Sequence, residues 1–554
     1  MAFTRGEFIA LSAVSAFSQT RPVPAWVSAT VKRHDANVER LLSVQITDPR
    51  SRWRGIFPDE YGLHNPGSAE GVIDAFVTAY LHPESKFYQD KALPERIRLA
   101  ADFLTSAQSP DGNIDLLTTN FNSPPDTGFV VRALCPSIKV AQRDGATELV
   151  RMLKPFLRKA GAGMVKGGVH TPNHRWVVSA ALAQLYDLFG DPAYVRRIDQ
   201  WLAEGIDIDE EGQFTERSTY VYNPITDNAF VTMSAKLERP ELLDPARRNL
   251  SSMLYLLHSD YEVVTEISRR QDLNQRGDMG PYWFALAYLA HHDKDGRLAT
   301  IARHFAPTRA SLSALMEYPE LMEDGPRPAP IPEQYRRSFP HNGLVRIRNG
   351  QMSATILAGD RSRFFTLRNG EAVINAVRFA SAFFGKGQFA SPAVKDNNGI
   401  IELEQQLTAQ YYQPLDPPRK VDADDYPSTV KDRRHTEICR LLQSVTVIET
   451  PAGFRLRIRA HGTRDVPLAV EINFREGGRL DGVTPVGKVS DAYIFSSGKA
   501  SYQMGSDVIR FGPGIAEHTY TQVRGAEPKL PGPSVYLTGL TPFDRTIEFE
   551  CLRA

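Results

Sequence analysis

Residues 167 to 178 bring together side chains that can bind anions and move protons. The stretch reads GGVHTPNHRWVV, so that His170, Asn173, His174 and Arg175 stand directly before an amphipathic run. An amide donates hydrogen bonds to a carboxylate, an arginine pairs with one, and a histidine exchanges protons near neutral pH. The simpler interpretation is a helix start, because Asn and Pro-Asn compositions also cap helices and form turns. Further residues are needed to decide between the two.

Three more polar clusters interrupt apolar runs, at residues 111–129, 215–230 and 265–278. Their candidate substrate-binding side chains are Asn120, Asn122, Asp126, Tyr220, Tyr222, Arg269, Arg270 and Gln271. The clusters recur every ~50 residues, roughly one helical pair with its loops. In an antiparallel array of helices, alternate connections emerge on the same face. We therefore expect the four clusters to line one cleft.

The elements that must position these clusters change in character near residue 335. From about 68 to 318, apolar residues recur at spacings of three and four, as in RWVVSAALAQLYDLF and NLSSMLYLLHSDY, which predicts short helices. The stretch GPRPAPIP, 325–332, holds four prolines and predicts a linker. Beyond it, segments such as GLVRIRNG alternate apolar and polar residues between Gly and Asn turns. The fold class expected is multidomain α+β, with a helical half followed by an antiparallel β-sandwich.

Composition excludes several function classes. The chain has 554 residues, 42% of them hydrophobic, which predicts a folded protein with two large domains. Lys+Arg and Asp+Glu are equal at 65, so no global field attracts nucleic acid or an anionic membrane. No window offers the ~20 apolar residues of a membrane span. The three cysteines fit neither a zinc site nor a disulfide scaffold. We expect no required cofactor, and no ligand spacing supports a structural zinc or calcium.

Residues 1–20 have the order of a bacterial export signal. An early arginine is followed by an apolar run from Phe8 to Phe17 and by small residues. The alternative is a short N-terminal helix. We therefore expect a periplasmic or secreted protein, with a cytoplasmic one as the alternative.

Together these motifs resemble a family. Asn173-His174 at a helix start, a Glu-x-Ser followed by tyrosines about fifty residues later, and FPHNGLVRIRNG at 339–350 are similar to the heparinase II/III-like polysaccharide lyases. The resemblance implies an incomplete (α/α) toroid joined to an antiparallel β-sandwich. Together with the export-like order and the proline-rich stretch, it gives the expected domains: a possible export signal at 1–20, the catalytic toroid at 21–324, a linker at 325–338 and the sandwich at 339–554.

The resemblance also implies a reaction. These lyases cleave a uronic-acid-containing glycan by β-elimination: they remove the C5 proton, expel the 4-linked sugar and leave an unsaturated uronate. Asn173 resembles the residue that binds the uronate carboxylate, assisted by Arg175. His174 and Tyr222 resemble the proton-transfer pair. A free tyrosine titrates near pH ~10, so its phenolate needs the help of cations such as Arg269 and Arg270.

Some alternatives stay open at this point. Tyr220 fits the tyrosine position almost as well as Tyr222. His341 reaches the substrate only if its segment folds against the cleft. A glycoside hydrolase would need two carboxylates, for which Asp126 with Asp227 or Glu266 could serve. A non-catalytic carbohydrate-binding protein is the other alternative. The few basic residues favour an unsulfated anionic polysaccharide or oligosaccharide as the substrate.

Overall fold

The structure is a computed structural model that describes residues 24–323, 325–359, 361–487 and 489–553. The export signal predicted at residues 1–20 lies outside the described residues. Within the described ranges, no helix is long and apolar enough to cross a membrane.

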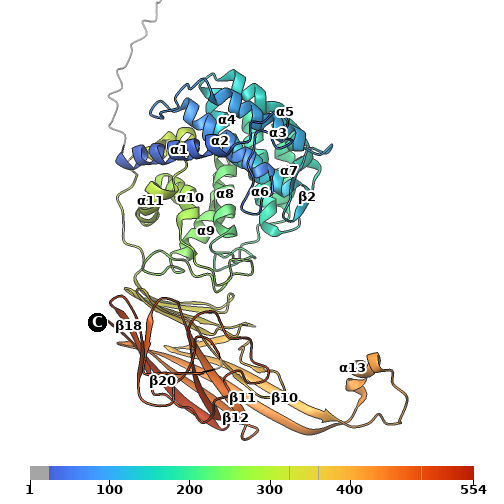
Figure 1. The fold of residues 1–554 in the computed structure, drawn as a ribbon, viewed down its shortest axis with the longest axis vertical. Coiled ribbons are helices and arrows are strands. Elements are labelled where there is room, and N and C mark those ends of the chain that lie inside the picture. Colours follow the sequence, from blue (N-terminus) through green and yellow to red (C-terminus); the bar gives the residue numbers. More distant parts are fainter. Residues whose placement is uncertain (1–23, 324, 360, 488, 554) are drawn as a thin grey trace, which may run out of the picture. The chain divides into compact units, whose positions relative to one another are not determined.

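Helices fill the first half of the chain, as the periodicity predicts (Figure 1). They are α1 (Ala25–Val44), α2 (Pro66–Leu81), α3 (Leu93–Ala107), α4 (Pro124–Arg143), α5 (Thr147–Lys166), α6 (Pro172–Phe189), α7 (Pro192–Ala203), α8 (Tyr222–Leu237), α9 (Asp244–Met253), α10 (Trp283–Asp293), α11 (Gly296–Arg309) and α12 (Leu312–Glu317). In α5, for example, Leu149, Leu153, Phe156 and Ala160 are buried, which is the spacing of one helix face. A small hairpin, β1 (Ile114–Leu116) with β2 (Asn120–Ser123), interrupts this half.

Strands fill the second half. They are β3 (Gln334–Phe339), β4 (Leu344–Asn349), β5 (Met352–Leu357), β6 (Phe365–Asn369), β7 (Ala372–Ser381), β8 (Gly387–Gln388), β9 (Val394–Asn397), β10 (Ile400–Tyr412), β11 (His435–Thr450), β12 (Gly453–Gly462), β13 (Pro467–Phe474), β14 (Arg479–Asp481), β15 (Thr484–Pro485), β16 (Ala492–Ile494), β17 (Ala500–Met504), β18 (Asp507–Gly512), β19 (Ser534–Leu540) and β20 (Phe543–Arg553). One sheet has the order β14-β17-β18-β20-β12-β11-β10-β9, and the other runs β15-β16-β19-β13-β7-β6-β5-β4-β3. Pairing is antiparallel except between β16 and β19.

The two sheets share one apolar core. In the first sheet, Leu403 of β10 lies opposite Val445 of β11, which lies opposite Ile458 of β12. In the second sheet, the register aligns Val377, Ile472 and Val535 of β7, β13 and β19. All six side chains belong to the same buried cluster. The second half is therefore a β-sandwich, and the predicted fold class, toroid plus sandwich, is confirmed.

The described chain divides into two compact units. Unit 1 comprises residues 1–168, 184–195 and 287–328, of which residues 24 onward are described, and unit 2 comprises 169–183, 196–286 and 329–554. Unit 2 thus joins the sandwich to the start of α6, most of α7, and α8 and α9. The strand β3 begins at Gln334, within the stretch predicted as a linker. The domain limits drawn from the sequence remain predictions.

A long hairpin leaves the sandwich of unit 2. Strands β10 and β11 pair from Ile400 with Ile448 to Tyr412 with His435. The short helix α13 (Tyr426–Thr429) lies at the far end of this hairpin (Figure 1). We call residues 413–434 the hairpin tip. Its residues 416–420 and 422–428 are all exposed.

Candidate functional site

The first turn of α6 carries Asn173 and His174. Both side chains are buried, with 3% and 7% of their surface exposed. The amide Nδ2 of Asn173 donates to Glu216 Oε2 at 2.6 Å and to Thr171 Oγ1 at 3.2 Å. The first contact is the short one, so Glu216 fixes the orientation of the amide.

Glu216 links this helix start to a second loop. Its Oε1 lies 3.3 Å from Nη1 of Arg270. Burial raises the pKa of the Glu216 carboxyl, against the opposing effects of the Asn173 hydrogen bond and the Arg270 charge. The buried carboxyl is therefore easier to protonate than an exposed one.

Arg270 in turn contacts Tyr222, the first residue of α8. The guanidinium carbon lies 4.8 Å from the centroid of the Tyr222 ring, a cation–π distance. Gln271 Nε2 donates to the Tyr222 hydroxyl at 2.9 Å. Tyr222 is half-buried and Gln271 is exposed, so this end of the cluster meets solvent. Contacts thus run without a break from Asn173 through Glu216 and Arg270 to Tyr222 and Gln271. We call these five residues the site cluster.

Asp272 holds the two loops of the site cluster together. This fully buried carboxylate accepts hydrogen bonds from the hydroxyls of Ser218 and Ser268 and from the backbone N–H of Tyr220. Ser218 Oγ also accepts the N–H of Tyr222 at 3.0 Å and so caps the start of α8. The sequence places Asp272 in a polar cluster but gives no sign that it is buried. Its role, like that of Glu216, was missed.

Tyr220 and Tyr222 differ in their surroundings. The ring of Tyr220 packs on the backbone of Gly277 so closely that a Cβ atom there would lie 2.1 Å from Tyr220 Cδ2. Tyr222, by contrast, contacts Arg270 and Gln271 with its ring and hydroxyl. Tyr222 thus contacts the other residues of the site cluster, and its role in proton transfer stays a prediction.

His174 follows Asn173 in the first turn of α6. Its ring meets the ring of the exposed His170 edge-on, with centroids 4.7 Å apart. The backbone N–H of His174 donates to Thr171 O at 3.2 Å. The sequence prediction that His174 transfers protons is neither supported nor opposed by these contacts.

Two of the predicted substrate-binding arginines bind the protein itself. Arg175 donates to Asp207 Oδ1 at 3.0 Å and to Gly205 O at 3.1 Å, and its side chain is 12% exposed. The indole of Trp176 also donates to Asp207. Arg269 donates from its side chain to Thr215 O at 3.3 Å. Arg175 therefore fixes the start of α6 against the loop that follows α7.

His341 lies beside the loop that carries Glu216. Its backbone oxygen accepts a hydrogen bond from Arg217 Nη2 at 3.2 Å, and its N–H donates to Glu211 Oε1 at 2.9 Å. The imidazole is 60% exposed and lies 3.9 Å from Asp209 Oδ2. The opening segment of the sandwich thus contacts this loop, and a substrate role for His341 stays a prediction.

The first polar cluster belongs to unit 1. There Asn120 Nδ2 donates to Asp126 Oδ2 at 2.8 Å, and Asn122 Nδ2 donates to Asp111 Oδ2 at 2.9 Å. The Asp126 carboxylate also accepts a hydrogen bond from the hydroxyl of Ser123, the N-cap residue of α4. Three of the four predicted clusters meet within unit 2; a substrate role for Asn120, Asn122 and Asp126 stays a prediction.

The carboxylates that a hydrolase would use are poorly placed. Asp227 is fully buried, and burial raises its pKa well above the ordinary value, which favours the neutral form. Glu266 Oε1 accepts the hydroxyl of Thr366 at 3.2 Å, on β6 of the sandwich. Asp227 cannot reach a glycosidic bond without unfolding its helix.

Comparison with solved structures decides the fold family. A Streptomyces coelicolor chondroitin AC lyase, solved with chondroitin sulphate, matches 96% of this chain and 80% of its own, with a TM-score of 0.56 and 13% identity. A Paenibacillus xanthan lyase matches 95% of this chain and 57% of its own, with a TM-score of 0.55 and 10% identity. A heparinase III matches 87% and 76%, with a TM-score of 0.52 and 9% identity. The chain has the fold of the heparinase-like polysaccharide lyases.

This lyase fold confirms the resemblance drawn from the sequence motifs. At the level of sequence alone, no family model and no curated protein matches the chain. The identities of 9–13% establish the lyase fold and leave the chemistry to be argued from the site cluster.

Proposed function

We propose that this protein is a polysaccharide lyase that cleaves a uronic-acid-containing glycan by β-elimination. The observation that carries the proposal is the unbroken site cluster, Asn173–Glu216–Arg270–Tyr222–Gln271. It brings a carboxylate-binding amide, a buried carboxyl, a cation and a phenol together from three separate loops. Three unrelated helix caps would not require these residues to contact one another.

The amide end of the cluster suits the substrate carboxylate. The C5 proton of a uronate becomes acidic only when charge on the neighbouring carboxylate is neutralised as the enolate-like state forms. Glu216 holds one N–H of Asn173, while the second N–H makes only the longer contact with Thr171. A substrate carboxylate replaces Thr171 in this arrangement. Because Asn173 is only 3% exposed, Thr171 must move to admit it.

The phenol end suits proton transfer. Gln271 donates to the Tyr222 oxygen, and Arg270 lies over the ring face, so both contacts accommodate negative charge on the phenol. Tyr222, acting as its phenolate, takes the C5 proton, the electrons of the C5–H bond form the C4–C5 double bond, and the C4–O bond breaks. The leaving oxygen then receives a proton from His174, which sits one residue from Asn173. Arg175 and Asp272 act as positioning residues.

The substrate class follows from this chemistry. One carboxylate-binding amide and one cation suit an unsulfated uronate, bound as part of an anionic oligosaccharide or polysaccharide. We place the enzyme in the periplasm or outside the cell, on the export-like order of residues 1–20.

The type of product tests the proposal. β-Elimination creates a conjugated double bond that absorbs ultraviolet light, whereas hydrolysis does not. A panel of uronic polysaccharides should include one whose cleavage raises ultraviolet absorbance in step with new reducing ends. New reducing ends without an absorbance gain would replace the lyase by a hydrolase.

A further inference from the structure

A cavity of about 810 Å³ lies within unit 2, between the loop of residues 260–276 and the strands of the sandwich. Its volume lies in the range of ligand-binding sites, ~300–1,000 Å³. The site cluster does not line it, although Gln271 lies on the same loop as its lining residues Glu266, Asn274 and Gln275. The cavity is therefore a separate feature that the proposed chemistry leaves unexplained.

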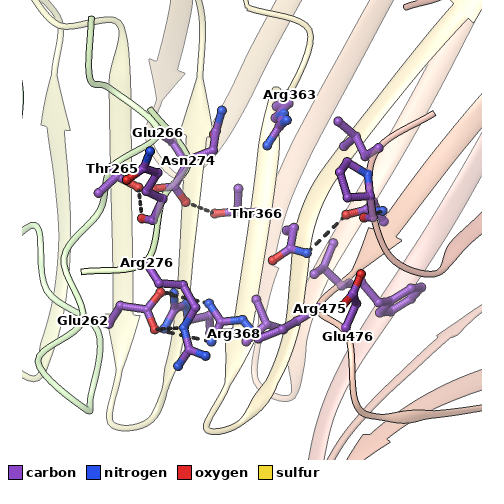
Figure 2. Close-up of a pocket in the computed structure, with 18 of the residues that line it drawn as sticks. Glu262, Thr265, Glu266, Asn274, Arg276, Arg363, Thr366, Arg368, Arg475 and Glu476 are labelled. Atoms are coloured by element: carbon purple, nitrogen blue, oxygen red, sulfur yellow. Dashed lines mark hydrogen bonds and ion pairs between the residues drawn. The ribbon is translucent and has the colours of Figure 1, made fainter. Parts of the chain in front are cut away.

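One side of the cavity is an ion cluster that is already satisfied. The Glu262 carboxylate forms ion pairs with Arg368, with Arg475 at 2.9 Å and with Arg276 at 3.3 Å. Dashed lines mark these contacts in Figure 2. These contacts lower the pKa of the Glu262 carboxyl although its burial acts in the opposite direction. Asp260 Oδ2 also lies 3.8 Å from Arg368, so three guanidinium groups face two carboxylates on this wall.

Arg363 stands in contrast to that cluster. It is half-buried and lines the cavity, yet no hydrogen bond or ion pair joins it to any residue of the described ranges. Figure 2 shows its guanidinium apart from the dashed contacts of Glu262. Burial and the charge of Arg378 lower the pKa of Arg363, and the charges of Glu527, Glu266 and Glu471 act in the opposite direction without forming an ion pair with it. A half-buried cation without a partner is costly, so a partner from outside the chain is expected.

The electrostatics around the cavity favour an anion. Among its ionisable lining residues, those that are buried or half-buried are Arg363, Arg368 and Arg475 against Glu262 and Glu266. The acidic residues Asp260, Glu371 and Glu476, and the basic residue Arg276, also line the cavity but are exposed, where water screens them. Beneath the cavity wall, burial and then the charges of several arginines, Arg368 first among them, hold the pKa of His258 well below its ordinary value.

The rest of the lining suits a sugar. Ile374, Phe474, Met504 and Leu530 supply apolar surface, and Asn274, Gln275 and Asn375 supply amides. A pyranose ring presents apolar faces and hydroxyl edges, so both kinds of surface are used. The planar guanidinium of an arginine binds a carboxylate or a sulfate ester through two hydrogen bonds.

We propose that this cavity binds an acidic sugar residue, with Arg363 donating to its oxyanion. The inference rests on the proposed function only for the class of ligand, an acidic glycan. It adds a second binding site, separate from the site cluster, that senses the charge of another sugar residue of the glycan.

Binding without turnover tests the inference. In the full-length Tyr222→Phe background, calorimetry would measure unsulfated chondroitin tetrasaccharide, its sulfated form and neutral chitotetraose. Adding Arg363→Gln should weaken binding of an acidic tetrasaccharide roughly ten- to hundredfold, by the usual strength of a charged hydrogen bond. Arg363→Lys, which keeps the positive charge, should lose less affinity than Arg363→Gln. If Arg363→Gln weakens binding of the unsulfated form, the carboxylate is the group that Arg363 binds. If it weakens binding of the sulfated form alone, the sulfate ester is that group.

Arg455→Gln is the matched control. Arg455 lies on the same sandwich, 49% exposed and paired with Glu548, and does not line the cavity. Its loss should leave binding unchanged. The inference would be overturned if Arg363→Gln bound the acidic tetrasaccharides as tightly as its parent, or if Arg455→Gln lost as much affinity. It would also be overturned if chitotetraose bound as tightly as the acidic tetrasaccharides, or if neither acidic tetrasaccharide bound.

Two results separate this inference from the proposed function. If the enzyme forms the elimination product and Arg363→Gln leaves its KM unchanged, the cavity inference is wrong and the lyase proposal holds. Arg363-dependent binding by a protein that forms no unsaturated product would do the reverse. Because Arg363 has no partner in the described ranges, its replacement should not lower the melting temperature, so misfolding does not confuse either result.

Discussion

At the scale of single residues, Asn173 has two duties. Its amide holds the buried Glu216 carboxyl at 2.6 Å, and in the proposed reaction it also binds the substrate carboxylate. Asn173→Ala should therefore reduce kcat roughly a hundredfold or more. It should also cost about 1–3 kcal/mol of stability, because Glu216 loses a donor. Steady-state kinetics and urea unfolding measure both. If the folded variant turns over substrate normally, Asn173 has only a structural role at the start of α6.

Tyr222 and Tyr220 form a natural pair of variants. Tyr222→Phe removes the hydroxyl that accepts from Gln271, so activity should fall by about two to four orders of magnitude with little change in melting temperature. Tyr220→Phe keeps the ring packed on Gly277 and should stay active. The reverse pattern in the ultraviolet assay would transfer the proton-transfer role to Tyr220 and leave the lyase proposal in place.

Glu216 gives a pH signature. Its folded-state pKa is raised above the ordinary 4.5 by burial, so folding favours the protonated form. The stability that this provides is complete below the unfolded pKa and is lost as pH rises through the folded pKa. Glu216→Gln cannot ionise. Its melting temperature relative to the wild type should therefore rise across this window, in scans from about pH 4 to about pH 8. Parallel curves would show that Glu216 is not perturbed.

Residue types in the sequence identified much of the site, but not its partners. Asn173, Tyr222, Arg270 and Gln271 were all singled out from polar clusters, and the structure brings them together. Arg175 was assigned to the substrate because its type suits a carboxylate. The structure gives it Asp207, a partner 32 positions away that spacing along one helix could not reveal. Arg363 was missed because one arginine before a strand has no local signal.

At the scale of elements, the loop of residues 265–276 depends on a single buried acid. Asp272→Asn keeps the size of the side chain but has one acceptor oxygen for the donors of Ser218, Ser268 and Tyr220. Unfolding should become easier by about 2 kcal/mol or more. Activity should fall as well, because Gln271 and Tyr222 lose their alignment. Unchanged urea midpoints and kinetics would show that the loops hold together without this carboxylate.

Element types followed from periodicity more reliably than element ends did. The pattern at 249–261 predicts a helix, yet α9 stops at Met253 and a bridge between Leu257 and Val263 follows. Leu254, Leu256 and Leu257 are buried without continuing the helix. These apolar residues can be buried in a helix or in an irregular segment, so their spacing along the sequence could not distinguish the two conformations. Likewise, the polar cluster at 111–129 contains the hairpin of β1 and β2 instead of a simple turn.

At the scale of the whole molecule, the hairpin tip is a long connection whose residues 416–420 and 422–428 are all exposed. Trypsin should cut first after Arg419 or Lys420, both of which are exposed. The nicked enzyme should stay folded and active, because β10 and β11 remain paired from Ile400 to Tyr412. Electrophoresis with activity measurements follows both. First cleavage outside the hairpin tip would contradict this order. Loss of activity on nicking would give the tip a role in function.

The net charge of zero shows why global composition could not find the ligand. Around Glu262 three guanidinium groups face two carboxylates, whereas elsewhere charges pair one to one, as Arg457 does with Asp544. Averages over 554 residues cancel this local difference. The lyase fold was recognisable from short motifs, whereas the cavity depends on strands that converge only after folding.

One loop serves both ligand positions: Arg270 and Gln271 touch Tyr222, while Glu266, Asn274 and Gln275 line the cavity. Two ligands that order the same segment are thermodynamically linked, and each must raise the affinity of the other by the same factor. A short acidic fragment that fills only the cavity would then act as an activator of small substrates instead of a competitor. Product released into the cavity would speed the next cleavage, and the progress curve would begin with a lag.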